Sequence, residues 1–170
     1  MDLAADGTLS IREILKSEHV KGLQGVTQVV CSSNGKFIYT TSGRFEGAHA
    51  ICAFEMGADK KLKLIHSLSN SGGELPNFSG GNKIRISPDG NAIYVTATNS
   101  NHIACLQRDA KSGKLTLTEM LDCAELPGTP KGPNGLAFSQ DGKHMYVTWE
   151  FSKGVSPLLR GRVPAAERGK

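Results

Sequence analysis

The chain has 170 residues, of which 38% are hydrophobic and 21% are charged, and its formal net charge is +4 at pH 7. This length allows a globular core, and no run of 18 apolar residues indicates a transmembrane helix. Residues 160–170 alone carry a net charge of +3, so the other 159 residues carry only +1. We therefore expect neither a nucleic-acid nor a membrane partner, because both need a concentrated basic or apolar surface.

Three segments with nearly the same sequence recur about 50 residues apart. They are Ser32-Ser-Asn-Gly-Lys-Phe-Ile-Tyr-Thr-Thr41, Ser87-Pro-Asp-Gly-Asn-Ala-Ile-Tyr-Val-Thr96 and Ser139-Gln-Asp-Gly-Lys-His-Met-Tyr-Val-Thr148. Their Asn/Asp-Gly turns and their tyrosines are spaced by 55 and 52 residues, and a Leu-x-Leu or Leu-x-Ile pair recurs every 53 residues. Three landmarks in register indicate a repeat architecture, in which one unit cannot bury its faces alone.

Each unit contains short β-branched or aromatic runs bounded by turn residues, which predicts strands. In the second unit we expect strands at 83–87, 92–96, 102–108 and 114–120, with a tight turn at Pro88-Asp89-Gly90. The run 92–96 is continuously apolar, so we expect it to be covered on both faces. Four antiparallel strands in about 50 residues are typical of a propeller blade. The predicted fold is therefore all-β, a β-propeller with about three four-stranded antiparallel blades.

The units lie near 6–56, 57–109 and 110–160, and residues 161–170 are expected to form a basic, disordered tail. The first unit begins with the sequence of a fourth strand, and the third unit ends after its third strand. Either the chain is a fragment of a longer propeller, or copies of it complete one another in a closed ring; a free-standing monomer of three blades is the least favoured alternative. An open stack of three blades leaves an apolar sheet face uncovered at each end, which predicts self-association.

The four cysteines, Cys31, Cys52, Cys105 and Cys123, permit three disulfide pairings but require none. Cys31 occupies the repeat position of Ile86 and Phe138, so we interpret it as a small core residue. The sequence near Met1 does not have the charged-then-apolar pattern of a signal peptide, which favours a cytoplasmic location.

Common catalytic motifs are absent from the sequence. No Gly-x-Gly occurs, so neither a dinucleotide fingerprint nor a P-loop is present, and there is no Gly-x-Ser-x-Gly nucleophile elbow. No His-x-His or Cys-x-x-Cys spacing suggests metal ligands. We therefore expect no metal and no other cofactor. Asp89 and Asp141 lie in predicted β-turns, which accounts for both carboxylates without catalysis.

Candidate functional residues come from the loops at one end of the propeller, where several blades supply side chains on a rigid scaffold. These loops follow the fourth strands and join the second strands to the third. A histidine and a carboxylate beside a cation could carry out acid–base chemistry on an anionic substrate. The candidate catalytic residues are His49, Glu46, His19 and Glu150; the candidate substrate-binding residues are Arg44, Asn82, Asn134 and Lys153.

The segment from Ile84 to Thr96 is followed by Asn101-His-Ile103 and Gly113-Lys-Leu115. With these residues, the sequence of the second unit resembles the lactonase-type β-propeller family. The resemblance covers residues 6–155. It implies a seven-bladed fold and a metal-independent hydrolase acting on a sugar lactone such as 6-phosphogluconolactone. The alternative is a non-catalytic propeller that binds a protein, peptide or glycan.

Catalytic members of this family carry a histidine just before the first strand of a blade. The matching positions here are Thr27, Asn82 and Asn134, and none of them is histidine. The resemblance therefore implies that these three positions do not supply the family's histidine.

Overall fold

The computed structural model describes residues 2–3, 9–11, 13–43 and 47–159. The regular structure of these residues consists of β-strands and two short 3-10 helices, without an α-helix. Within the same residues, no helix has the length and apolarity that crossing a bilayer requires. The prediction of an all-β fold is confirmed.

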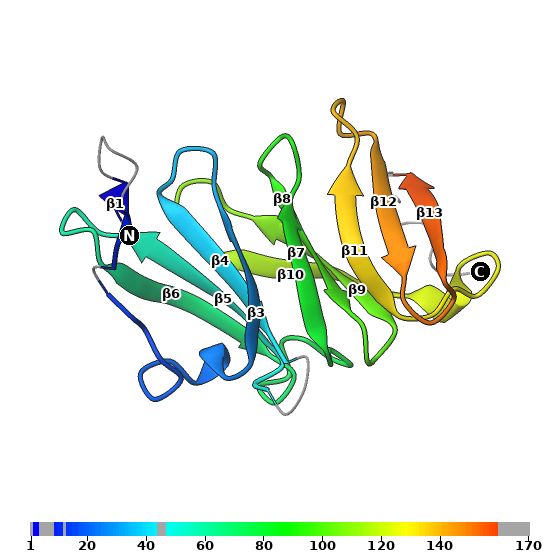
Figure 1. Cartoon of the computed structure of the whole chain (residues 1–170), viewed down its shortest axis with the longest axis horizontal. Helices are drawn as coiled ribbons and strands as arrows, with labels where there is room; N and C mark the ends of the chain where they lie inside the picture. Colours follow the sequence, from blue (N-terminus) through cyan, green and yellow to red (C-terminus); the bar gives the residue numbers. More distant parts are fainter. Residues whose placement is uncertain (1, 4–8, 12, 44–46, 160–170) are drawn as a thin grey trace.

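Three antiparallel sheets follow one another along the chain, each in simple sequential strand order (Figure 1). The first sheet contains β3 (Val26–Cys31), β4 (Phe37–Ser42), β5 (Ala50–Met56) and β6 (Leu62–Ser69). The second contains β7 (Gly81–Ile86), β8 (Ala92–Ala97), β9 (His102–Arg108) and β10 (Leu115–Asp122). The third contains β11 (Pro133–Phe138), β12 (His144–Trp149) and β13 (Gly154–Leu159).

Small elements surround these sheets. Strands β1 (Asp2–Leu3) and β2 (Leu9–Ser10) pair with each other, helix η1 (Lys21–Leu23) precedes the first sheet, and helix η2 (Cys123–Glu125) follows the second. The strands expected in the second unit are all present, with bounds that differ by at most two residues. In the third sheet Pro157 lies on β13, an edge strand, where a residue without an N–H group is tolerated.

The repeated serine and Asn/Asp of each unit build the same turn three times. The Ser32 hydroxyl accepts from Phe37 N at 2.9 Å and donates to Asn34 Oδ1 at 2.7 Å. The second turn repeats these bonds through Ser87 and Asp89, and the third through Ser139 and Asp141. The glycine that follows has a φ near +70° in all three turns, a conformation that disfavours other residues. As predicted, Asp89 and Asp141 form hydrogen bonds within the β-turns.

The sheets pack face to face and radiate from their first strands, since β7 lies beside both β3 and β11. Figure 1 shows the three sheets arranged side by side in chain order. One core lies between the first and second sheets and includes Phe37, Tyr39, Ile84 and Val95. A second core lies between the second and third sheets and includes Ile103 and Val147. Strand β8 contributes to both cores, which confirms that it is covered on both faces.

The prediction that Cys31 is a core residue is wrong, because its side chain is exposed. The repeat explains the difference. Its counterpart Phe138 faces back towards the preceding sheet, where it meets Tyr94 edge-to-face at 5.4 Å. Cys31 shares the face of β3 that carries Val29, and among the described residues no preceding sheet covers that face; Val29 is 56% exposed. No disulfide bond joins the four cysteines.

Candidate functional site

A line of polar contacts crosses from blade to blade where the inner strands begin. The Thr27 hydroxyl on β3 donates across the first interface to Gly81 O on β7 at 2.9 Å. Next to Gly81, Asn82 Nδ2 donates across the second interface to Asn134 Oδ1 on β11 at 2.7 Å. Asn134 Nδ2 in turn donates to Glu150 Oε2 at 2.8 Å. We call this set of connected residues the axial polar line; its members are Thr27, Asn82, Asn134 and Glu150.

The direction of this line is fixed by its last member. An ionised carboxylate only accepts hydrogen bonds, so Asn134 must present its amide nitrogen to Glu150 and its oxygen to Asn82. Asn82 is therefore the donor to Asn134, and it is 3% exposed. Such charge-assisted bonds are short and hold a carboxylate in one orientation. The axial polar line thus orients the carboxylate of Glu150, which is exposed.

The repeat accounts for this arrangement. Asn82 also reaches Thr98 Oγ1 at 3.4 Å, and Thr98 follows the second strand of its blade. One unit later, Asn134 and Glu150 occupy the same two places and form a 2.8 Å bond. A glutamate in place of a threonine therefore turns a structural contact within one blade into a carboxylate site in the next.

Neighbouring threonines and a glutamine complete the inner edge, and the sequence predictions did not include them. Thr98 Oγ1 donates to Pro133 O at 2.7 Å, and Thr96 Oγ1 donates to Asn134 O at 3.0 Å. Gln28 Oε1 accepts from Ile84 N at 2.9 Å. Their positions within the repeat unit could have identified them, because each lies within two residues of a position whose side chain faces the next blade.

Backbone conformations with positive φ are concentrated in the loops at this end. His49 has a φ of 46°, Thr129 of 43° and Lys153 of 52°, and this region is least favourable for the β-branched Thr129. Strained residues of this kind tend to cluster at functional sites, where the surrounding structure holds them in place. The loop that carries Glu150 and Lys153 is fixed by bonds from Glu150 N to Gly132 O and from Lys131 N to Ser152 Oγ, both at 2.8 Å.

His49 lies at the boundary of the first two blades. Its Nδ1 accepts from Gly80 N at 3.5 Å, two residues before Asn82. Gly43 has a φ of 112°, and a side chain there would collide with the His49 ring and backbone. The structure therefore places His49 close to the first half of the axial polar line. No hydrogen bond or ion pair between His49 and Glu150 is present in the described part of the chain.

The remaining sequence candidates are placed differently. His19 is exposed on a local turn, where its Nδ1 accepts from Lys16 N at 3.3 Å, and the next residue, Val20, packs on the outer face of the first sheet. His19 thus lies apart from the axial polar line. Arg44 and Glu46 lie outside the described residues. In the part of the chain that the structure describes, no group of three or more His, Cys, Asp or Glu side chains could hold a metal ion.

Three radiating antiparallel sheets, with their first strands at a common inner edge, define a β-propeller protein. A family profile described as "Lactonase, 7-bladed beta-propeller" matches residues 4–126. The chain belongs to this lactonase family of seven-bladed β-propellers. The third sheet, with Asn134 and Glu150, lies beyond the matched residues.

Solved structures show the same fold at low sequence identity. The periplasmic gluconolactonase PpgL of Pseudomonas aeruginosa superposes with a TM-score of 0.68 at 20% identity, over 81% of this chain and 36% of that one. A candidate 6-phosphogluconolactonase from Bacteroides fragilis superposes with a TM-score of 0.68 at 22% identity, over 81% of this chain and 35% of that one. A protein from Lactobacillus plantarum superposes with a TM-score of 0.68 at 18% identity, over 87% of this chain and 42% of that one. The chain thus spans about a third to two fifths of these proteins. No curated protein sequence matches it.

Proposed function

We propose that this chain is part of a hydrolase that opens a sugar lactone, with Glu150 as the general base. The observation that carries the proposal is the axial polar line, which fixes one exposed carboxylate at the inner edge of the blades. Membership of the lactonase family and the likeness to a gluconolactonase support this reaction class.

In the proposed step, the Glu150 carboxylate removes a proton from a water molecule as its oxygen attacks the lactone carbonyl carbon. The ring C–O bond then breaks, and the ring oxygen leaves as an alkoxide that takes up the proton held by Glu150, which gives the open hydroxy acid and restores the carboxylate. General base catalysis of this kind contributes roughly 10²–10⁴-fold to a rate. His49 is half-buried at the boundary of the first two blades, where it can contact the rest of the sugar.

Glu150→Gln tests this role. It keeps the shape and the hydrogen bond from Asn134 but cannot take a proton. We expect lactone opening, measured as acid release in a pH-stat, to fall by roughly 10²–10⁴-fold. Glu125→Gln is the matched control, because Glu125 is an exposed glutamate in the neighbouring loop. Equal rates in both variants would refute Glu150 as the base.

The substrate class is proposed to include 6-phosphogluconolactone, with Lys153 near the phosphate. Lys153 is exposed and lies three residues after Glu150 on the same fixed loop. Lys153→Gln should raise the KM for the phosphorylated lactone and leave the KM for unphosphorylated gluconolactone unchanged. An equal effect on both lactones would remove Lys153 from phosphate recognition.

A non-catalytic binding function is the second candidate. It is favoured by Thr27, Asn82 and Asn134, which offer neutral hydrogen-bonding groups where the family resemblance implies a histidine. Calorimetry of lactone turnover by the wild-type protein and by the Glu150→Gln variant separates the two functions. No turnover by the wild-type protein would favour the binding module for a protein, peptide or glycan, whereas turnover that disappears in the variant would favour the hydrolase.

Self-association of this chain is a further proposal. The outward face of the first sheet exposes Val29, at 56%, while its repeat counterpart Ile84 is buried against the preceding sheet. At the other end, Tyr146 is 42% exposed, although its counterpart Tyr39 is fully buried at an interface between sheets. A second copy can therefore stack its third sheet on the first sheet, and thereby repeat the internal contact.

Light scattering tests this stacking. The wild-type chain should form dimers or larger species whose fraction rises with concentration, and Val29→Glu should make it monomeric. Lys63→Glu on β6 is a surface charge control. A wild-type protein that stays monomeric at high concentration would contradict the proposal.

A further inference from the structure

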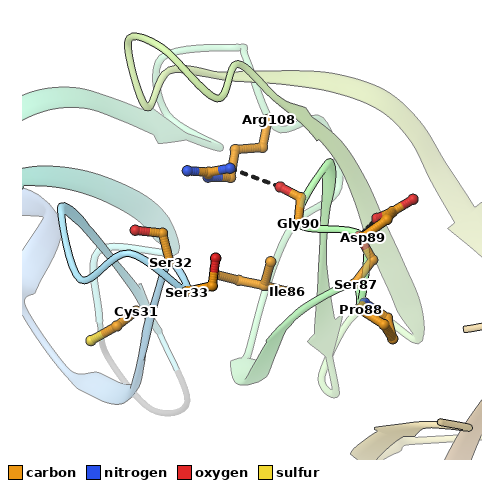
Figure 2. A pocket seen from close by; sticks show the side chains of 9 residues that line it. All are labelled: Cys31, Ser32, Ser33, Ile86, Ser87, Pro88, Asp89, Gly90 and Arg108. Atoms are coloured by element: carbon orange, nitrogen blue, oxygen red, sulfur yellow. Dashed lines mark hydrogen bonds between the residues drawn. The ribbon is translucent and has the colours of Figure 1, made fainter.

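A pocket lies at the end of the blades opposite to the axial polar line, beside the repeated turns (Figure 2). It sits between the first and second sheets and has a volume of about 230 Å³. This is below the roughly 300–1,000 Å³ of pockets that hold drug-sized ligands, so it would suit a small ion or a single functional group. Its polar and charged lining residues are Ser32, Ser33, Ser87, Asp89 and Arg108, with Gly90 beside them.

Arg108 is the unusual member of this pocket, because it is a cation that is only 8% exposed. Its Nε donates to the Tyr39 hydroxyl across the interface at 2.8 Å, and its Nη1 donates to Gly90 O at 2.8 Å. Its guanidinium also lies 5.5 Å from the centre of the Phe37 ring. These contacts hold the group rigidly, yet they involve only two of the five N–H donors of an arginine.

No carboxylate neutralises Arg108 within the described residues. Asp109, the next residue, is engaged by its own turn, where it accepts from Lys111 N at 2.9 Å and Ser112 N at 2.7 Å. Asp89 accepts from the Ser87 hydroxyl and from Asn91 N. Figure 2 shows the Asp89 side chain directed away from the guanidinium, on the far side of Gly90. A buried charge without a counter-ion is costly even when it is hydrogen-bonded, and such a site gains from a bound anion.

The groups that face the guanidinium are suited to an oxyanion. In Figure 2 the guanidinium points towards Ser32 and Ser33 on the opposite wall of the pocket. The Ser32 hydroxyl is engaged by its turn, but that of Ser33 makes no hydrogen bond to the described residues and is exposed at the rim. Arginine binds carboxylates and phosphates through paired N–H groups, and a serine hydroxyl adds one more donor.

We propose that this pocket between the first two blades is an oxyanion site, in which the free N–H groups of Arg108 and the Ser33 hydroxyl bind a phosphate or carboxylate group. Because Arg108 contacts both Tyr39 of the first sheet and Gly90 of the second, a bound anion strengthens the contact between the blades. The site lies at the end opposite to Glu150, so it is independent of lactone hydrolysis.

Calorimetric titration of the purified chain with inorganic phosphate, and separately with succinate, at constant ionic strength tests the site and distinguishes the two anion types. We expect saturable binding of one anion per chain, with a rise in melting temperature at saturation of about 2–4 °C. Arg108→Met should abolish both effects. Arg85→Met is the matched control, because Arg85 is a half-buried arginine on β7 whose loss should leave binding unchanged.

Ser33→Asp keeps the test decisive if Arg108→Met fails to fold. It retains Arg108 and places a tethered carboxylate in the proposed anion position, so it should raise the melting temperature without added anion and prevent phosphate binding. Either of two results would overturn the proposal. One is the absence of saturable binding of both anions to the wild-type protein, and the other is undiminished binding to the folded Ser33→Asp variant.

Discussion

The contact between Gly113 and Phe37 offers a direct measure of how closely the first two blades pack. Gly113 lies in the turn between β9 and β10 with a φ of +73°. A Cβ atom added there would lie 2.7 Å from Cε1 and 2.8 Å from Cγ of Phe37, which is 1% exposed on the neighbouring sheet. Real Cβ contacts are not this short, so Gly113→Ala must displace a buried ring.

The expected magnitude has two parts. A left-handed backbone costs a residue with a Cβ atom about 1–2 kcal/mol, and forcing a group into a packed core costs about 1–3 kcal/mol. Gly35→Ala is the matched control, because Gly35 has a φ of +67° but its added Cβ would meet nothing within 4 Å. It should show the backbone cost alone. Any effect of alanine on the unfolded chain is common to both variants and cancels in the comparison.

Urea unfolding followed by circular dichroism measures this difference. We expect Gly113→Ala to lower the free energy of unfolding by about 1–3 kcal/mol more than Gly35→Ala, with unchanged m-values. Equal losses in the two variants, within about 0.5 kcal/mol, would refute the packing of the β9–β10 turn of the second blade on the first.

Three further outcomes are expected. Tyr39→Phe should lower the free energy of unfolding by about 1–3 kcal/mol, because Arg108 Nε loses its buried acceptor, whereas Tyr146→Phe on the exposed face should change it by less than about 0.5 kcal/mol. Burial raises the pKa of Cys123 to about 12, and it also raises the pKa of Cys52 and Tyr39. Folding favours the neutral forms of these groups, so their contribution to the free energy of unfolding is present below pH 9 and is lost as the pH rises from 9 towards 12. A urea midpoint that is the same at pH 7 and pH 10.5 would contradict this pH dependence. A thiol reagent at pH 8 should label exposed Cys31 quickly and leave buried Cys52 and Cys123 unlabelled until the chain unfolds, which mass spectrometry can check.

The sequence predicted the blades well because their signals are local and recur three times. The serine and the Asn/Asp of each turn bond within one short segment, so the same letters build the same turn in every unit. Cys31 was mispredicted for the opposite reason. Its repeat position is apolar and covered only where a preceding sheet exists, and the sequence pattern does not show which sheet has a neighbour.

The candidate site was predicted only in part. Glu150, Asn82 and Asn134 were singled out separately, but their joining into one directed line depends on contacts between residues 16 and 52 positions apart. His19 was grouped with them because loop position alone does not show whether a loop faces the inner edge or the outer face. Arg108, which is buried and forms no ion pair with any described residue, had no sequence signal, since an arginine at the end of a strand is usually solvated.

The sequence by itself determined the strand content, the turns, the repeat and the end of the blades that carries most candidate residues, because each depends on neighbours within a few positions. The tertiary structure alone decided which side chains meet across the interfaces: Asn134 with Glu150 and Asn82 at one end, and Arg108 with Tyr39 at the other. The physical reason is that these contacts depend on how one sheet is placed against the next. That placement is fixed by packing around the buried cores and not by any local pattern of residues.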